Sequence, residues 1–145
     1  MNNDFLKLEN QLCFSVYATS RAITKLYRPF LNELGITYPQ YLVMLVLWEK
    51  ENITLKDLGN KLYLDSGTLT PLLKRLESIG YIKRERSTED EGLLCVSITD
   101  KGNELKEKAL NIPKCIVECL DYDPMLLFKL KKEIDSLLSN INKED

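Results

Sequence analysis

Apolar residues recur every three to four positions along most of this chain, which is the period of a helix that buries one face. The first such stripe predicts a helix over residues 7–34, ended by Gly35, with a kink or break at Pro29. A second segment, residues 40–50, follows a Thr-Tyr-Pro start signal and is apolar on nearly all sides. Such a helix belongs at the buried centre of a fold.

Two shorter helices separated by a turn are predicted next. Thr54 caps the first of them, and Gly80 ends the second. For the start of the second helix, Pro71 leaves two possibilities open. Either Thr70 caps this helix and Pro71 is its first residue, or a turn that begins at Ser66 leads into the helix with a bend. The core face of this helix is formed by four leucines: Leu69, Leu72, Leu73 and Leu76.

The apolar period then changes to two. Residues 81–86 and 93–98 predict two strands of a β-hairpin, joined by a polar turn. Thr99 caps a further helix to about residue 110, and Pro113 interrupts the pattern. A last amphipathic helix starts at Asp123-Pro124. Its candidate buried residues are Met125, Leu127, Phe128, Leu130, Ile134, Leu137, Leu138 and Ile141.

The order of these elements is that of a winged helix-turn-helix, so we expect a mainly α fold with a small β-hairpin. In this module the second short helix enters the DNA major groove, and the hairpin, or wing, reaches toward the neighbouring backbone or minor groove. The charge distribution agrees. Residues 54–86 hold seven basic and four acidic side chains, a local charge of +3, whereas the whole chain carries −2. A basic segment in an acidic chain indicates a polyanionic partner.

Composition excludes several other classes. The chain has no histidine, which removes histidine-based acid–base catalysis and most zinc sites, and we expect no metal or cofactor. It begins without the pattern of a signal peptide and contains no apolar run of about 18 residues, which favours a cytoplasmic protein and no membrane contact. We therefore expect free thiols at Cys13, Cys95, Cys115 and Cys119, with Cys95 in the core.

Several stretches resemble a known family. Residues 65–77, DSGTLTPLLKRLE, resemble the recognition helix of MarR-family repressors. Residues 8–14, LENQLCF, resemble the segment that holds the reactive cysteine in the OhrR branch, the organic-hydroperoxide sensors, and in their SarZ and MgrA relatives. Residues 26–29, LYRP, and 37–41, TYPQY, match as well. The resemblance covers nearly the whole chain and weakens beyond Pro113.

The resemblance implies a homodimer built from one MarR-type domain per chain, over residues 1–145. Interleaved helices from residues 1–35 and 100–145 would form the dimer, and residues 36–99 would form the DNA-binding lobe. Two winged modules would address the half-sites of a pseudopalindromic double-stranded operator. The resemblance further implies a repressor, not an enzyme, that senses organic hydroperoxides and then releases its operator.

The predicted recognition helix and wing carry the candidate DNA contacts. Phosphate contacts supply most of the affinity, and base edges supply sequence choice. Hydroxyl and basic side chains can serve both purposes, and Pro71 can pack against a thymine methyl group. The expected DNA-binding residues are Ser66, Thr68, Thr70, Pro71, Lys74, Arg75, Arg84 and Arg86.

The wing departs from the family pattern at its tip. Where the family has an arginine, this chain reads Asp90-Glu91-Gly92, so Asp90 loses the ion-pair partner expected at residue 92. A narrow minor groove attracts arginine electrostatically. We therefore expect weaker or less A·T-selective minor-groove contact, and a gain in DNA affinity on Gly92→Arg.

Peroxide oxidation requires a thiolate, whereas an ordinary thiol, with a pKa of about 8.5, is mostly protonated at neutral pH. In the OhrR branch tyrosine hydroxyls stabilise this thiolate. The matching residues are Tyr17, one helical turn after Cys13, and Tyr27 and Tyr38, which we expect from the partner subunit. Oxidation first gives a sulfenic acid. Cys119 and Cys115 are the candidates to form a disulfide with the oxidised Cys13. Alternatively, both cysteines only pack their own helix, or a small-molecule thiol forms the disulfide with Cys13.

Two other functions stay open at this point. The protein could be a repressor released by a small phenolic or lipophilic ligand, with Cys13 a small packing residue. More distantly, Cys13 could be the nucleophile of a thiol peroxidase, although no thioredoxin-like βαβ pattern surrounds it.

Overall fold

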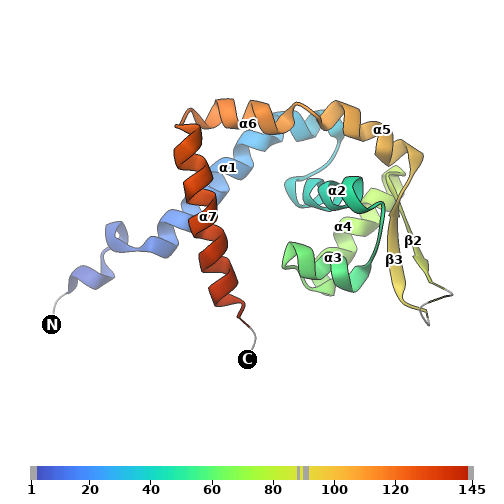
Figure 1. Cartoon of the computed structure of the whole chain (residues 1–145), viewed down its shortest axis with the longest axis horizontal. Coiled ribbons are helices and arrows are strands. Elements are labelled where there is room, and N and C mark those ends of the chain that lie inside the picture. Colours follow the sequence, from blue (N-terminus) through green and yellow to red (C-terminus); the bar gives the residue numbers. More distant parts are fainter. Residues whose placement is uncertain (1–2, 88, 90–91, 144–145) are drawn as a thin grey trace. The chain divides into compact units, whose positions relative to one another are not determined.

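The computed structural model describes residues 3–87, 89 and 92–143. Most of its elements are helices, and its strands form one small three-stranded sheet (Figure 1). The chain forms two compact units, residues 1–111 and 112–145. The mainly α architecture with a winged hairpin is the fold class that the sequence predicts.

The long first helix begins later than the sequence predicts. Two 3₁₀ turns, Asn3–Leu6 and Leu8–Asn10, precede α1, which runs from Leu12 to Leu34. Gln11 has an extended backbone and separates the turns from the helix. Of the predicted kink or break at Pro29, the break is wrong, because α1 continues through this residue. Pro29 is solvent-exposed, so water can satisfy the carbonyl that loses its N–H partner.

Helix α2, Tyr38–Lys50, is the centre of the first unit, as its apolar pattern predicts. Thr37 and Gln40 form a capping box at its start. Its buried side chains are Gln40, Tyr41, Val43, Met44 and Leu47. Trp48 is half-buried, and its indole N–H donates a 2.9 Å hydrogen bond to the carbonyl of Gly102. This bond joins α2 to α5, Asp100–Ala109.

The helix-turn-helix consists of α3, Leu55–Leu62, and α4, Ser66–Ile79. Thr54 caps α3 as predicted, and Asp65 caps α4 by accepting from the Thr68 N–H at 2.7 Å. Pro71 is not the first residue of the helix, and the segment from Ser66 is helix, not a turn. Helix α4 runs from Ser66 onward with Pro71 in its interior. Pro71 is exposed, which lets water reach the carbonyl that it leaves without a partner.

The hairpin strands β2, Ile82–Arg86, and β3, Leu94–Ile98, lie where the sequence predicts them, and β3 also pairs with a short strand that the sequence analysis missed. This strand, β1, spans Asn52–Thr54, and the sheet order is β1-β3-β2, antiparallel throughout. Three residues are too few to show a period of two, so β1 carries no pattern signal. Its pairing with β3 ties the wing to the start of α3.

The second unit contains α6, Ile112–Leu120, and α7, Pro124–Ile141. Pro113 lies in the first turn of α6, where a missing N–H is tolerated. The expectation that α7 is buried is wrong for the single chain, because none of its residues is buried. Its apolar side chains, such as Met125 and Phe128, face solvent. In the described part of the chain no helix is both long and apolar enough to cross a membrane.

Gly59 sets how closely α3 approaches the turn that leads into α4. A Cβ at this buried position would lie 2.7 Å from the backbone carbonyl oxygen of Leu64, which itself follows a left-handed residue, Tyr63. We predict that Gly59→Ala lowers the free energy of unfolding by about 1–3 kcal/mol, because backbone must move to admit the methyl group. Urea unfolding measures this loss. Asn60→Ala, at an exposed position of the same helix, should stay within about 0.5 kcal/mol of wild type. Equal stability of the two variants would contradict the close approach.

Candidate DNA-binding surface and thiol site

Helix α4 presents a polar and basic face opposite its buried leucines. Leu69, Leu73 and Leu76 are fully buried, whereas the predicted DNA-contacting side chains lie on the other sides of the helix. Those that are exposed are Ser66, Thr68, Pro71, Lys74 and Arg75. Thr70 is half-buried, and its hydroxyl donates to the Ser66 carbonyl at 2.7 Å. The face thus offers cations and hydroxyl groups to a groove, with Thr70 partly engaged within the helix.

Arg84, a predicted DNA contact, is bound to the recognition helix instead of extending into solvent. Its Nη2 and Nε donate to Glu77 Oε1 at 2.9 and 3.2 Å, and its backbone N–H donates to Glu77 Oε2 at 3.1 Å. These hydrogen bonds lower the pKa of the Glu77 carboxyl, which keeps it ionised. A planar guanidinium held in this way fixes direction as well as distance. Arg84 therefore orients the wing on the last turn of α4.

Arg86 and Gly92 close the wing. Arg86 Nη1 donates to the Gly92 carbonyl at 2.8 Å, and the Gly92 N–H donates to the Ser87 carbonyl at 2.9 Å. Gly92 has φ of +80°, a left-handed conformation that strains any residue with a Cβ. The expected gain from Gly92→Arg therefore needs correction, since the arginine would come with a strained turn. Asp90 and Glu91, named with it above, lie outside the described residues.

Cys13 is exposed near the start of α1. It is the second residue of the helix, and the preceding Gln11 makes no side-chain cap. The Gln11 amide donates instead to the carbonyls of Phe5 and Lys7, at 2.7 and 2.8 Å. The first-turn N–H groups of α1 thus lack a side-chain acceptor from Gln11, and such groups attract an anion. The thiol stands at the end of a helix that favours negative charge.

Two of the three predicted thiolate-supporting tyrosines form a cluster at the other end of α1. The rings of Tyr27 and Tyr38 have centroids 4.8 Å apart, and Tyr41 lies 5.6 Å from Tyr27. Burial, followed by the charges of Tyr38 and Tyr41, raises the pKa of Tyr27 to about 12, and burial also raises the pKa values of Tyr38 and Tyr41. These phenols therefore stay protonated at neutral pH and can act as hydrogen-bond donors.

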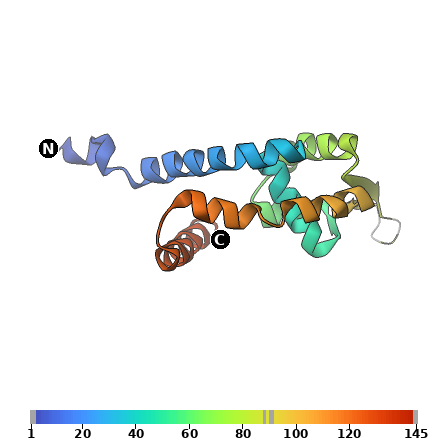
Figure 2. The same cartoon turned by 90° about the horizontal axis from the view of Figure 1, so that it is seen from above.

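The single chain brings Cys13 together with Tyr17 and keeps it apart from Tyr27 and Tyr38. Tyr17 follows one turn later on the same helix face. Tyr27 lies fourteen positions after Cys13 on one continuous helix, a distance of about 21 Å at 1.5 Å per residue. The amino-terminal half of α1 extends away from α2 and the sheet (Figure 2).

The remaining cysteines differ in access. All four cysteines are free thiols. Cys119 is exposed and Cys115 is half-buried, both on α6, where Ile112 and Ile116 are buried. Cys95 lies on β3 as predicted but is only half-buried, with its thiol 3.8 Å from the Leu93 carbonyl. Within the described residues no cluster of acidic and cysteine side chains is placed to hold a metal ion.

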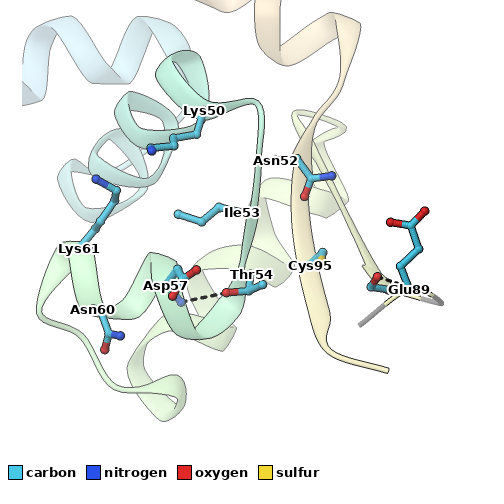
Figure 3. Close-up of a pocket in the computed structure, with 10 residues that line it drawn as sticks. Lys50, Asn52, Ile53, Thr54, Asp57, Asn60, Lys61, Glu89 and Cys95 are labelled. Carbon is cyan, nitrogen blue, oxygen red and sulfur yellow. Dashed lines mark hydrogen bonds between the residues drawn. The ribbon is translucent and has the colours of Figure 1, made fainter. Parts of the chain in front are cut away.

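An open pocket of about 600 Å³ lies between β1, α3 and the wing (Figure 3). Its lining includes Cys95 and Thr54, together with the charged side chains of Lys50, Asp57 and Lys61. Both signs of charge and two asparagine amides line it as well. Such walls do not suit a lipophilic ligand, which binds where apolar side chains predominate. This pocket therefore gives no support to release by a lipophilic small molecule.

Two further residues of these sites were missed by the sequence analysis. Glu77 entered the sequence analysis only as one of the four acidic residues of 54–86 and as the last residue of the stretch 65–77. Its spacing of seven residues from Arg84, with Gly80 between them, was the weak signal available for this contact. Arg21 has its guanidinium carbon 5.5 Å from the centroid of the Tyr17 ring. A basic residue four positions after a tyrosine on a predicted helix was the signal available for this contact.

Comparison with known proteins agrees with this geometry. Residues 25–109 match the model of a family described as the transcriptional regulator SarA/Rot. The chain is 51% identical to the organic hydroperoxide resistance transcriptional regulator of Bacillus subtilis (strain 168). The alignment spans 142 residues, which are 98% of this chain and 97% of that protein. It is 40% identical over 132 residues to the regulator SarZ of Staphylococcus saprophyticus, covering 91% and 90%.

The solved structures of AbfR are similar over almost their whole length. AbfR of Staphylococcus epidermidis is 39% identical, with a TM-score of 0.79 and coverage of 98% of both chains. Overoxidised AbfR bound to DNA is 40% identical, with a TM-score of 0.77 and coverage of 97% and 99%. Disulfide-formed AbfR has a TM-score of 0.65 at 40% identity, covering 94% and 96%.

These matches define a winged-helix regulator of transcription. The chain belongs to the SarA/Rot family of transcriptional regulators, among the organic hydroperoxide and SarZ-type members of the MarR class. The fold prediction and the family resemblance are thereby confirmed.

The pairing of Glu77 with Arg84 predicts that loss of the Glu77 charge weakens DNA binding, although the loss of a negative charge alone would strengthen it. Glu77→Gln removes a negative charge beside the DNA-binding face, which by itself would tighten DNA binding. We expect the variant to bind DNA about 3–10-fold more weakly, because the wing loses its fixed direction on α4. Fluorescence anisotropy on a DNA fragment from the region upstream of its own gene measures the affinity.

The matched control is Glu85→Gln. Glu85 is an exposed wing glutamate, and its carboxylate pairs with Lys83 Nζ at 3.2 Å on the same strand. Its removal should leave the affinity unchanged or slightly higher. If Glu77→Gln tightened binding to the same extent as this control, Arg84 would not orient the wing.

Proposed function

We propose that this regulator is a homodimeric transcription repressor that binds a pseudopalindromic operator and releases it when an organic hydroperoxide oxidises Cys13. The observation that carries the proposal is the position of Cys13: an exposed thiol in the first turn of a long helix, one turn before a tyrosine. Because its relatives are transcriptional regulators, which act on DNA, the protein would act in the cytoplasm and would not be an enzyme.

The thiolate would be supported from two chains. The helix N-terminus and Tyr17 come from the same chain as Cys13, and Tyr27 and Tyr38 from the partner. This assignment follows from the separation of about 21 Å along α1, which no side chain can span. The half-buried phenols of the partner are protonated donors, because partial burial raises their pKa values.

Exposed apolar side chains support the dimer. Phe5, Leu6 and Leu8 lie in the 3₁₀ turns at 61–85% exposure, and α7 exposes a row of apolar residues. Burial of this surface by a second copy would give the hydrophobic stabilisation that a single chain lacks. We assign residues 1–35 and 100–145 to the dimer and residues 36–99 to DNA binding.

The chemistry begins at the peroxide O–O bond. The Cys13 thiolate attacks one oxygen, a new S–O bond forms as the O–O bond breaks, and the leaving alkoxide takes a proton to become an alcohol. The product is a sulfenic acid. A second thiol can then displace its hydroxyl as water to form a disulfide. A disulfide-formed structure of AbfR agrees with the second product, and an overoxidised one agrees with oxidation of a thiol beyond the sulfenic acid.

Oxidation would reach the DNA through contacts of α1. The carbonyl of Leu34, at the end of α1, accepts a 3.1 Å hydrogen bond from the buried Tyr81 hydroxyl, which lies between α4 and β2. A disturbance of the subunit boundary at Cys13 would move α1 and with it the two winged modules. The recognition helices would then lose register with the half-sites, whose spacing is fixed by DNA geometry.

Cys13→Ser tests the sensor. Treatment with cumene hydroperoxide should abolish the DNA shift of wild-type protein and leave that of Cys13→Ser unchanged, because a serine hydroxyl does not attack the peroxide. Electrophoretic mobility shift before and after treatment is the measurement. Cys95→Ser serves as the control and should respond like wild type. Release of DNA by oxidised Cys13→Ser would show that another group is the sensor.

The resolving cysteine is tested separately. We propose that Cys119, the exposed thiol of α6, forms an intersubunit disulfide with Cys13, and that the half-buried Cys115 does so less readily. Non-reducing gels of peroxide-treated protein should show a crosslinked dimer that disappears in Cys119→Ser and persists in Cys115→Ser. Persistence of the crosslink in Cys119→Ser would assign the role to Cys115 or to neither.

A further inference from the structure

We propose that Arg21 is a positioning residue for the peroxide-sensing thiol and acts through Tyr17. This inference rests on the proposed role of Cys13 and adds a residue that lies outside all the stretches that carry the family resemblance. Cys13, Tyr17 and Arg21 follow one another at intervals of four residues on α1. Residues four apart on a helix are neighbours on one face, so the three side chains form a continuous row.

The contact between Arg21 and Tyr17 is the observation that carries the inference. The guanidinium carbon of Arg21 lies 5.5 Å from the centroid of the Tyr17 ring, within the range of a cation–π interaction. Arg21 forms no ion pair with any carboxylate in the described part of the chain, so its charge remains directed at the ring. Lys25 and Arg28 lie on the same helix, but neither is placed over an aromatic ring among the described residues.

The consequence of this contact concerns the phenol hydroxyl. In the single chain Tyr17 is 60% exposed, and an exposed ring changes rotamer freely unless a neighbour holds it. The cation restricts the ring and draws electron density from it, so the hydroxyl becomes a stronger hydrogen-bond donor. A stronger and better-directed donor one turn from Cys13 favours the anionic form of the thiol. Arg21 would thus tune the reactivity of Cys13 without touching it.

The test measures the thiol itself and does not depend on DNA. The rate of alkylation of Cys13 by iodoacetamide is followed from pH 5 to 9 in the full-length protein, and the peptide containing Cys13 is quantified by mass spectrometry. We expect Arg21→Gln to slow alkylation at pH 7 about threefold and to move the midpoint of the pH profile upward. Arg21→Lys keeps a cation over the ring and should retain most of the wild-type rate.

Two controls separate the proposed path from a general field effect. Lys25→Gln removes the same charge one turn further along α1 and should leave the profile unchanged. In a Tyr17→Phe background, Arg21→Gln should have no further effect, because the hydroxyl through which it acts is gone. Equal slowing by Arg21→Gln and Lys25→Gln, or an undiminished effect of Arg21→Gln in Tyr17→Phe, would overturn the proposal.

The outcome is distinguishable from a failure of the proposed function. If Cys13→Ser still releases DNA on oxidation, Cys13 is not the sensor, yet the alkylation profile still reports whether Arg21 acts on this thiol through Tyr17. Conversely, an unchanged profile in Arg21→Gln removes Arg21 from the mechanism and leaves Cys13 as the sensor.

Discussion

The rigidity of α1 is the constraint on which the thiol site depends. One uninterrupted helix carries Cys13 near its start and Tyr27 about 21 Å further along, and it passes through Pro29 without a break. A stiff rod holds its two ends apart, so a phenol cluster and a thiol on the same rod can meet only when two rods lie side by side in opposite directions. Under the proposed function, the reactive centre exists only in the assembled dimer. Peroxide chemistry and quaternary structure are therefore coupled from the outset.

A second set of contacts makes the DNA-binding elements into one body. Glu77 and Arg84 hold the wing on α4, the amine of Lys101 donates to the carbonyl of Ile79 at 2.7 Å, and the Tyr81 hydroxyl reaches Leu34 at the end of α1. The bonds of Lys101 and Tyr81 join elements that are distant in sequence, and the Glu77–Arg84 contact joins the consecutive elements α4 and β2. A body of this kind moves as a unit, so a displacement of α1 changes the position of the module and leaves its internal geometry intact.

The sequence predicted those features that are expressed by periodicity or by a local cap. The apolar α2, the capped starts of α3 and α5 and the two hairpin strands lie where they were expected. Three features had no such signal. The strand β1 is too short for a period, the helical course of α4 through Pro71 depends on hydration of an exposed face, and the engagement of Arg84 depends on a carboxylate seven residues away. The apolar stripe of α7 predicts a buried face, but it does not show whether that face is buried within one chain. In the single chain no residue of α7 is buried.

The hydrogen bond from Trp48 to Gly102 has a practical consequence. Trp48 is the chain's sole tryptophan, half-buried, with its indole 6.3 Å from the ring of Tyr41 and bonded to the backbone at the start of α5. Indole emission depends on the polarity around the ring and on the partner of its N–H group. The protein thus contains a built-in optical probe at the junction where the helix after the wing meets the core, readable without any attached dye.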